Sequence, residues 1–464
     1  WLTGLTALLG VAASTLPPAG VAVAAPRAGA VPGAAGPVSG QPVTGTPSFP
    51  ASTQPAERVR QLVECGGVMY AVGHFTVVQQ GGRTYRRNNA FSFSATAPFT
   101  MTGWNPGTNG MVDTIAFNSG HCSRAYLGGN FTKVAGRQAG HLAEVSTTGT
   151  GSLIGAFRHS ANREVETLAS YQNHVLAGGY FTSINGSSSD PYLASLNAVT
   201  GRDDGLLHLH ISGHMTYPGV AANDTKIYNQ QISHSGRLDL VEGDFTTVAG
   251  KRRHQVFMVN LASRPRATLT GWTSPRFDGR AGYPPHGYYY NCARGEPFYI
   301  RAGAWSPDDS TVYLASTGYR PWNYRSGLPL RGMCDTASAF SASQRHPQLK
   351  WINYTGCDSL YSVAADASAV YFAGHERYSD NPDGCDALGP GGIADPGMEG
   401  LVPATGQLLL AGQQPRYTRA RGLGADDMLV TSAGLWIASD NYLGAQSCGG
   451  VAGLAGICFL PYAP

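Results

Sequence analysis

The sequence predicts an all-β, disulfide-stabilised protein, a seven-bladed β-propeller of four-stranded blades. Three observations predict this fold. The 464-residue chain has 61 Gly, 23 Tyr and only 13% charged residues, a composition typical of short strands joined by turns. A short motif recurs along the chain, which indicates one architecture built from stacked units. Eight cysteines stand among Gly-rich turns, and an even number favours disulfides formed in an oxidising compartment.

The first residues are interpreted as the remnant of an export signal. The apolar run from Trp1 to Ala12 is too short to span a bilayer, and the small residues Ala22-Val23-Ala24 follow it as a cleavage site. We therefore assign 1–24 to a signal peptide, 25–55 to an Ala/Pro/Gly-rich linker whose end supplies a closing strand, and 56–464 to the propeller. The mature protein is expected to be secreted, extracellular or associated with the cell surface, with no membrane span.

The repeated motif marks one strand in each predicted blade. Its clearest copies are Val72-Gly73-His74-Phe75-Thr76, Gly128-Gly129-Asn130-Phe131-Thr132, Gly178-Gly179-Tyr180-Phe181-Thr182 and Glu242-Gly243-Asp244-Phe245-Thr246. Taking the residue five before the Phe as an anchor gives seven positions spaced roughly 60 residues apart, at Tyr70, Tyr126, Leu176, Leu240, Tyr313, Tyr371 and Trp436. Gly is expected where backbones crowd near the axis, and Phe where blades pack together.

A unit of this length suits four strands and their connections. In the second copy the strands are expected, from the axis outward, at Val112–Asn118, Arg124–Phe131, His141–Ser146 and Ser152–Phe157. The last blade lacks a partner for its outer edge, and the segment from Val38 to Pro50 is expected to supply it, which removes an exposed edge.

These copies resemble the delta-60 repeat β-propeller family, in which the form GG-x-F-T-x-V/I-x-G recurs in exported bacterial proteins. The resemblance is good from Tyr70 to Gly250 and fades afterwards, where the copies around Ser316, Gly374 and Ser439 lack the Phe. The Ala-rich export segment is similar to actinobacterial versions. The resemblance implies a propeller, but it implies no common reaction or ligand, so the function has to be argued from individual residues.

The late cysteines are placed symmetrically about two anchors. Cys292 and Cys334 lie 21 residues on either side of Tyr313, and Cys357 and Cys385 lie 14 residues on either side of Tyr371. This spacing predicts one disulfide within each of these blades. The predicted pairs are Cys292–Cys334, Cys357–Cys385, Cys448–Cys458 and Cys65–Cys122, of which only the last crosses between blades.

Two long insertions fall on the face that carries these late cysteines, and they concentrate aromatic and basic residues. The predicted ligand-binding residues are Tyr283, His286, Tyr288, Tyr289, Tyr290, Arg294, Tyr319, Arg320, Trp322, Tyr324 and Arg325. Aromatic faces stack on sugar rings or peptide side chains, and Arg supplies planar donors. Trp322 is expected to contribute most to binding, because it buries the largest flat surface. The structural alternative is a loop that packs on itself.

No short catalytic motif occurs, since HExxH, GxSxG, CxxC and phosphate-binding Gly loops are all absent from the sequence. We therefore assign no catalytic residue, no metal ligand and no cofactor. Turn or strand-end roles are expected for the polar residues at or after the motif's variable position, which are His74, Asp244, His375, Glu376 and Asp440. The oxygen-rich run Ser379–Asp386 matches a calcium loop only in part, so an Asx-rich turn is expected there.

The function favoured by the sequence is that of an exported, non-catalytic binding or scaffold propeller. Its partner is expected to be an extracellular polysaccharide, a cell-wall polymer or a protein, recognised through the loop face. A net charge of +3 gives no reason to expect nucleic acid. The alternatives are a glycan-active hydrolase or lyase with its site near the propeller axis, and a purely structural surface protein. The sequence does not indicate an oligomeric state.

Overall fold

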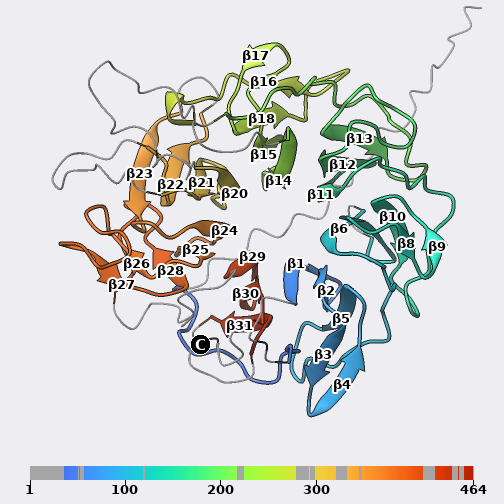
Figure 1. Cartoon of the computed structure of the whole chain (residues 1–464), viewed down its shortest axis with the longest axis horizontal. Helices are drawn as coiled ribbons and strands as arrows, with labels where there is room; N and C mark the ends of the chain where they lie inside the picture. The colour runs from blue at the N-terminus through green and yellow to red at the C-terminus, as the bar shows by residue number, and fades with distance from the viewer. Residues whose placement is uncertain are drawn as a thin grey trace, which may run out of the picture.

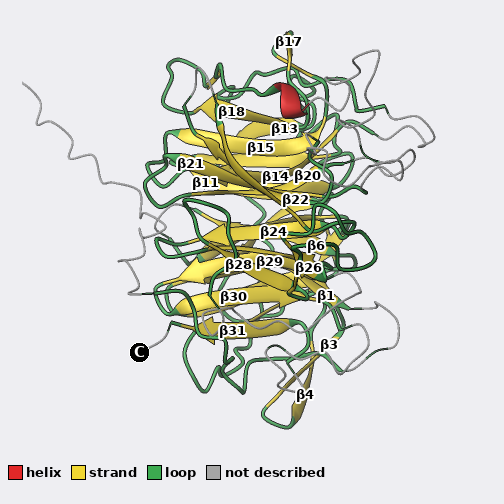
Figure 2. Ribbon diagram, turned by 90° about the vertical axis from the view of Figure 1, so that its left-hand side faces the viewer, coloured by secondary structure: helices red, strands yellow, loops and turns green. Residues whose placement is uncertain are grey.

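The computed structural model describes residues 36–50, 52, 57–118, 121–216, 224–277, 292, 298–319, 332–343, 347–410, 424–441, 448 and 454–462. Within them the chain is a β-propeller, in which antiparallel sheets lie around a common axis (Figure 1). Figure 2 shows the same sheets from the side, almost entirely as strand and loop. The described part has no α-helix and a single 3-10 helix, η1 (Pro275–Phe277). None of its helices is long and apolar enough to cross a membrane.

The described residues form seven main sheets, each of which starts with an inner strand. The inner strands are β1 (Arg58–Cys65), β6 (Val112–Phe117), β11 (Val165–Tyr171), β14 (Lys226–Ile232), β20 (Ile300–Trp305), β24 (Leu360–Ala365) and β29 (Ala425–Thr431). The second strands are β2 (Val68–His74), β7 (Arg124–Gly129), β12 (His174–Gly179), β15 (Leu238–Asp244), β21 (Thr311–Ser316), β25 (Val370–Gly374) and β30 (Gly434–Ser439). Each inner strand contacts the next along the chain, and β29 contacts β1.

Further out lie the third strands and a set of small hairpins. The third strands are β5 (Ala90–Ser94), β10 (Leu142–Ser146), β13 (Leu193–Asn197), β18 (Val256–Asn260), β22 (Thr336–Ser341), β28 (Met398–Leu401) and β31 (Ile457–Pro461). Two sheets add a fourth strand, β19 (Thr268–Leu269) or β23 (Leu349–Tyr354). The hairpins pair β3 (Val77–Gln80) with β4 (Arg83–Arg86), β8 (Lys133–Val134) with β9 (Arg137–Gln138), β16 (Thr247–Val248) with β17 (Lys251–Arg252), and β26 (Tyr378–Ser379) with β27 (Ile393–Ala394).

In the other five sheets a single bridged residue stands where a fourth strand was expected. The bridges are Phe93–Met101, Val145–Leu153, Leu196–Asp203, Leu401–Leu408 and Val38–Tyr462. In the second sheet the expected strand Ser152–Phe157 is therefore too long. Its backbone pairing ends with the bond from Ile154 N–H to the Glu144 carbonyl (2.8 Å), because the chain turns at Gly155 and Ala156.

The last sheet takes its outer segment from the other end of the chain. Backbone N–H groups of Ser39, Val43 and Phe49 donate to carbonyls of Pro461 (2.7 Å), Phe459 (2.9 Å) and Ala455 (3.0 Å), respectively, so the N-terminal segment runs antiparallel to β31. Phe49 then packs against Phe75 of the first sheet, with ring centroids 5.2 Å apart. The N-terminal segment thus covers the β31 edge and ties the last sheet to the first.

The core lies between neighbouring sheets, where the motif phenylalanines are buried as expected. Phe75, Phe131, Phe181 and Phe245 are each at most 1% exposed. All four disulfides join the predicted pairs, and Cys65–Cys122 links the first two sheets. The repeated motif therefore packs the sheets together, and covalent links fix several of their connecting segments.

Candidate functional site

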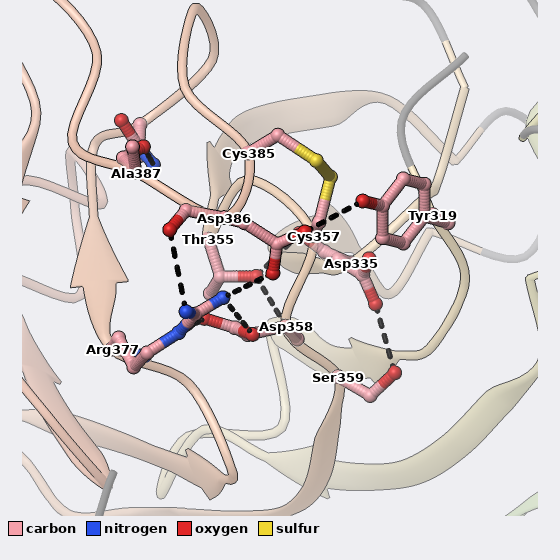
Figure 3. Close-up of a disulfide and its surroundings, with 11 residues drawn as sticks. Tyr319, Asp335, Thr355, Cys357, Asp358, Ser359, Arg377, Cys385, Asp386 and Ala387 are labelled. Atoms are coloured by element: carbon pink, nitrogen blue, oxygen red, sulfur yellow. Dashed lines mark hydrogen bonds and ion pairs between the residues drawn. A yellow bond between two sulfur atoms is a disulfide. The ribbon is translucent and has the colours of Figure 1, made fainter. Parts of the chain in front are cut away.

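The predicted loop-face site lies almost wholly outside the described residues. The predicted site residues outside the described part are Tyr283, His286, Tyr288, Tyr289, Tyr290, Arg294, Arg320, Trp322, Tyr324 and Arg325. Only Tyr319 is described. Its phenol donates a hydrogen bond to Oδ2 of Asp386 at 2.9 Å, which makes it part of the surroundings of the Cys357–Cys385 disulfide (Figure 3).

A charged network surrounds this disulfide, next to the start of β24 (Figure 3). Arg377 donates to both carboxylate oxygens of Asp358, at 2.7 Å from Nε and 2.8 Å from Nη2. Its Nη2 also lies 2.9 Å from Oδ1 of Asp386. The hydrogen bonds that Arg377 donates to Asp358 raise the pKa of Arg377, although burial lowers it. Arg377 and the two aspartates thus bind one another, as expected of a structural network.

A ring of polar side chains lies on the inner strands. Each inner strand carries a β-bulge against its second strand at the corresponding place. The bulged residues, called the axial ring below, are Arg60, Asp113, Glu166, Tyr228, Arg301, Tyr361 and Asp426. Bulges re-aim side chains, and here every re-aimed side chain is charged or phenolic. The side chains of Asp113 and Asp426 are buried, and the other five residues are partly exposed, so solvent reaches most of the axial ring.

The second Gly of the repeated motif makes room for this bulge. In five sheets a Cβ at that position would fall 2.0–2.3 Å from a carbonyl oxygen at the start of the inner strand or of the residue directly before it, closer than atoms can approach. At Gly179, for example, the Cβ would lie 2.3 Å from the carbonyl of Glu164. Ser316 and Ser439 take the equivalent place in the other two sheets. The repeat that indicates the fold therefore also shapes the axial ring.

One side of the axial ring is held by ion pairs across three sheets. Arg60 lies 3.2 Å from Oδ1 of Asp113 through Nε and 2.7 Å from Oδ1 of Asp426 through Nη1. The side chains of these two aspartates are only 2% and 7% exposed. Burial alone would lower the pKa of Arg60, but the two carboxylates keep it above its ordinary value. Arg60 therefore joins the first sheet to the second and the last.

Glu164, directly before β11, adds a second carboxyl beside Asp113. Burial, followed by the charge of Asp113, raises the pKa of Glu164 to about 8. Burial also raises the pKa of Asp113, although the charge of Arg60 opposes this. Two neighbouring carboxyls do not ionise together easily, so the pair favours holding one shared proton. Burial also raises the pKa of Glu166, which is two residues further along.

The next two inner strands after β11 carry cations over phenol rings. The Arg301 guanidinium lies 4.3 Å from the ring centroid of Tyr228, and Nζ of Lys226 lies 4.7 Å from the same centroid. Lys226 also donates a hydrogen bond to the hydroxyl of Tyr180. Burial lowers the pKa of Lys226, and the nearby charge of Glu166 opposes that effect. Carboxyls, cationic donors and aromatic faces are thus gathered on three consecutive inner strands.

The polar residues at the motif's variable position lie beside the axial ring rather than in it. His375 packs edge-on against Tyr361, with ring centroids 5.3 Å apart, and Asp440 forms a backbone bridge with Arg58. His74 is exposed at the end of β2. The remaining two, Asp244 and Glu376, are fully buried. Asp244 is the last residue of β15, as expected, whereas Glu376 lies beyond the end of β25.

The sequence analysis missed the axial ring, although a signal for it exists. Each bulged residue stands 10 to 13 positions before its blade's anchor. In several copies it closes a polar-apolar-polar triplet, as in Arg58-Val59-Arg60, Glu164-Val165-Glu166 and Lys226-Ile227-Tyr228. Polar side chains at alternating positions in the strand nearest the axis point to a polar axis. Because the repeated motif lies in the second strand, these triplets of the inner strand were not predicted as a site.

No family model matches the chain, and neither does any curated protein. Solved structures with a similar course of the chain include the WD40 β-propeller domain of Doa1, with 10% identity over 86% of this chain and 94% of that chain and a TM-score of 0.42. They also include the Neurospora crassa Pan2 WD40 domain (8% identity, 88% and 90%, TM-score 0.44) and the computationally designed Ika8 protein (9% identity, 92% and 100%, TM-score 0.42). Similarities this low carry no argument about function.

Proposed function

We propose that this chain is an exported, seven-bladed β-propeller of the delta-60 repeat type that binds an extracellular glycan at its axial ring. The observation that supports this proposal is the set of seven equivalent bulges, each carrying a charged or phenolic side chain. Hydroxyl-rich ligands are bound by carboxylates, cationic donors and aromatic faces acting together, and Glu166, Arg301 and Tyr228 provide one of each. In this proposal, the single bridged residue at each of five outer edges takes the place of the fourth strand of its blade.

The compartment and the loop face fit this proposal. Four disulfides indicate an oxidising environment, as expected for a secreted protein, here of bacterial origin. The two predicted loops precede β20 and follow β21, so they join the chain at the end of these strands where the bulges lie. We propose that Arg320, Trp322 and Arg325 of these loops contribute further contacts to the glycan.

The Asp113–Glu164 pair favours a second candidate, a glycan-active hydrolase or lyase. General acid–base catalysis on glycans needs one carboxyl that keeps its proton at the working pH and a second group that accepts one. Glu164 keeps its proton because of burial and the neighbouring charge of Asp113, and Glu166 supplies another carboxyl on the same strand. In this candidate Glu164 donates the proton to the leaving oxygen.

A glycan array tests the first proposal, and product assays separate it from the second. The array holds neutral and uronate-containing polysaccharides and is probed with wild type, Glu166→Gln and Arg301→Gln, with Arg137→Gln on the exposed β9 as control. We expect wild type and the control to bind the same glycans, and each axial-ring variant to bind at least tenfold more weakly. Wild type that binds no glycan overturns the proposal. Reducing-sugar or unsaturated-product release that Glu164→Gln abolishes would establish the second candidate.

A further inference from the structure

Two histidines on the segment that follows β13 face each other, away from the axial ring. His208 and His210 alternate with the buried residues Leu207, Leu209 and Ile211, which places both imidazoles on the outer side of the segment. Nε2 of His208 lies 2.9 Å from Nε2 of His210. His210 has a φ of +46°, a conformation that residues other than Gly keep only where the surrounding structure maintains it.

Asp190 lies beside the first of these imidazoles. Its Oδ1 lies 3.2 Å from Nδ1 of His208, and its side chain is 2% exposed. The negative charge of a carboxylate next to Nδ1 favours the tautomer with the proton on Nδ1, which leaves a lone pair on Nε2, the atom that faces His210. Metal-binding histidines are commonly oriented by a carboxylate in this way, because it fixes the ring and makes the ligand nitrogen more basic.

We propose that His208 and His210 bind a divalent transition metal ion in tetragonal coordination, with Cu(II) as the best match and Ni(II) next. With metal–nitrogen bonds of about 2.0–2.1 Å, two nitrogens at about 90° lie about 2.8–3.0 Å apart, and two in a tetrahedral site lie about 3.3–3.4 Å apart. The separation of 2.9 Å fits the tetragonal arrangement, which imidazole ligands form with Cu(II) and Ni(II).

The proposal assigns two protein ligands and leaves the other coordination positions to water or an external ligand. In the part of the chain that the structure describes, no group of three His, Cys, Asp or Glu is placed to hold a metal. This distinguishes the site from a closed structural centre, which takes all its ligands from the protein. Metal binding is therefore expected to be reversible and removable by a chelator without unfolding the chain.

Titration with copper(II) chloride tests the proposal, followed by calorimetry and electron paramagnetic resonance. Wild type is expected to bind one Cu(II) at this site with hyperfine coupling to two imidazole nitrogens. His208→Ala and His210→Ala should each weaken that binding at least tenfold and remove the two-nitrogen signal. The matched control is His174→Ala, because His174 also pairs with an aspartate, Asp204 at 2.7 Å, but has no histidine facing it within the described residues; it should bind Cu(II) as wild type does.

Melting each variant without metal shows whether a loss of binding comes from a loss of fold. If the double variant His208→Ala/His210→Ala folds and keeps the Cu(II) affinity and spectrum of wild type, the proposal is wrong and the two imidazoles only hydrogen bond to each other. If His174→Ala loses the signal as well, the metal sits elsewhere and the assignment also fails.

Discussion

The axial ring and the network around Cys357–Cys385 use the same residue types with different results. In both, one arginine binds two aspartates, Arg60 in the ring and Arg377 in the network. Around Arg377 both aspartates are hydrogen-bonded to the arginine beside the disulfide. Beside Arg60, burial keeps the pKa of Glu164 and Glu166 raised, next to partly exposed cations and phenols. Perturbed groups on an accessible surface indicate function, whereas matched pairs at a crosslink indicate stability.

The largest expected effect comes from removing the arginine at each centre. Arg60→Ala leaves Asp113 without its ion pair and leaves Asp426 with only Arg58, whose Nη1 lies 3.9 Å from Oδ1. Removing one partner of a buried ion pair costs about 3–5 kcal/mol of the free energy of unfolding. Arg377→Ala should cost less, because the side chain of Asp386 is 63% exposed and water can solvate it. Denaturant unfolding of both variants checks the order. Equal losses would mean that the two centres do not differ in burial as described.

The disulfide should matter for stability and not for binding. Replacing Cys357 and Cys385 together with Ala is expected to lower the free energy of unfolding by about 2–4 kcal/mol, since the unfolded chain regains the freedom of the closed loop. Glycan affinity should stay within twofold of wild type, because the axial ring is held by its own bulges. A folded double variant that has lost glycan binding would show that the network belongs to the site.

The bulges are tested by filling the space of a motif Gly. Gly179→Ala forces a Cβ against the carbonyl of Glu164, so we expect a loss of about 1–3 kcal/mol in stability together with weaker glycan binding. Gly103→Ala is the matched control, because its Cβ would meet nothing closer than 3.8 Å. If Gly179→Ala matches this control in both measurements, the motif Gly does not shape the ring.

The last expected effect is a change in the pH dependence of stability. Glu164 titrates near 4.5 when unfolded, and burial raises its pKa to about 8 in the folded protein. Between these values the folded state holds a proton that the unfolded chain has lost, so this group's contribution to stability falls as pH rises from about 5 to 8. Glu164→Gln should remove that contribution. The difference between the two unfolding curves isolates it, and a difference that does not vary with pH would contradict the shared proton.

Sequence reasoning succeeded where a feature is local and repeated. The buried phenylalanines, such as Phe75, and three of the disulfide pairs follow from positions within one blade, and Cys65–Cys122 follows from equivalent turns of two neighbouring blades. The axial ring does not, because its contacts join strands that are far apart in the chain; Arg60 and Asp426, for example, are 366 residues apart. Each contact also depends on a β-bulge, and a bulge requires no particular residue type in the inner strand. A fourth strand was predicted at every outer edge, although five edges carry only a single bridged residue, because a single bridged residue and a short strand look alike in sequence.

The central claim is that glycan binds at the axial ring. Its most direct test is an affinity titration of Glu166→Gln and Trp322→Ala, with melting curves, against a glycan that wild type binds on the array. Glu166→Gln keeps the shape of the side chain, so we expect normal melting and an affinity at least tenfold lower, equivalent to about 1.4 kcal/mol. If Glu166→Gln binds as tightly as wild type while a folded Trp322→Ala does not bind, the site lies on the loop face and the account of the axial ring is wrong.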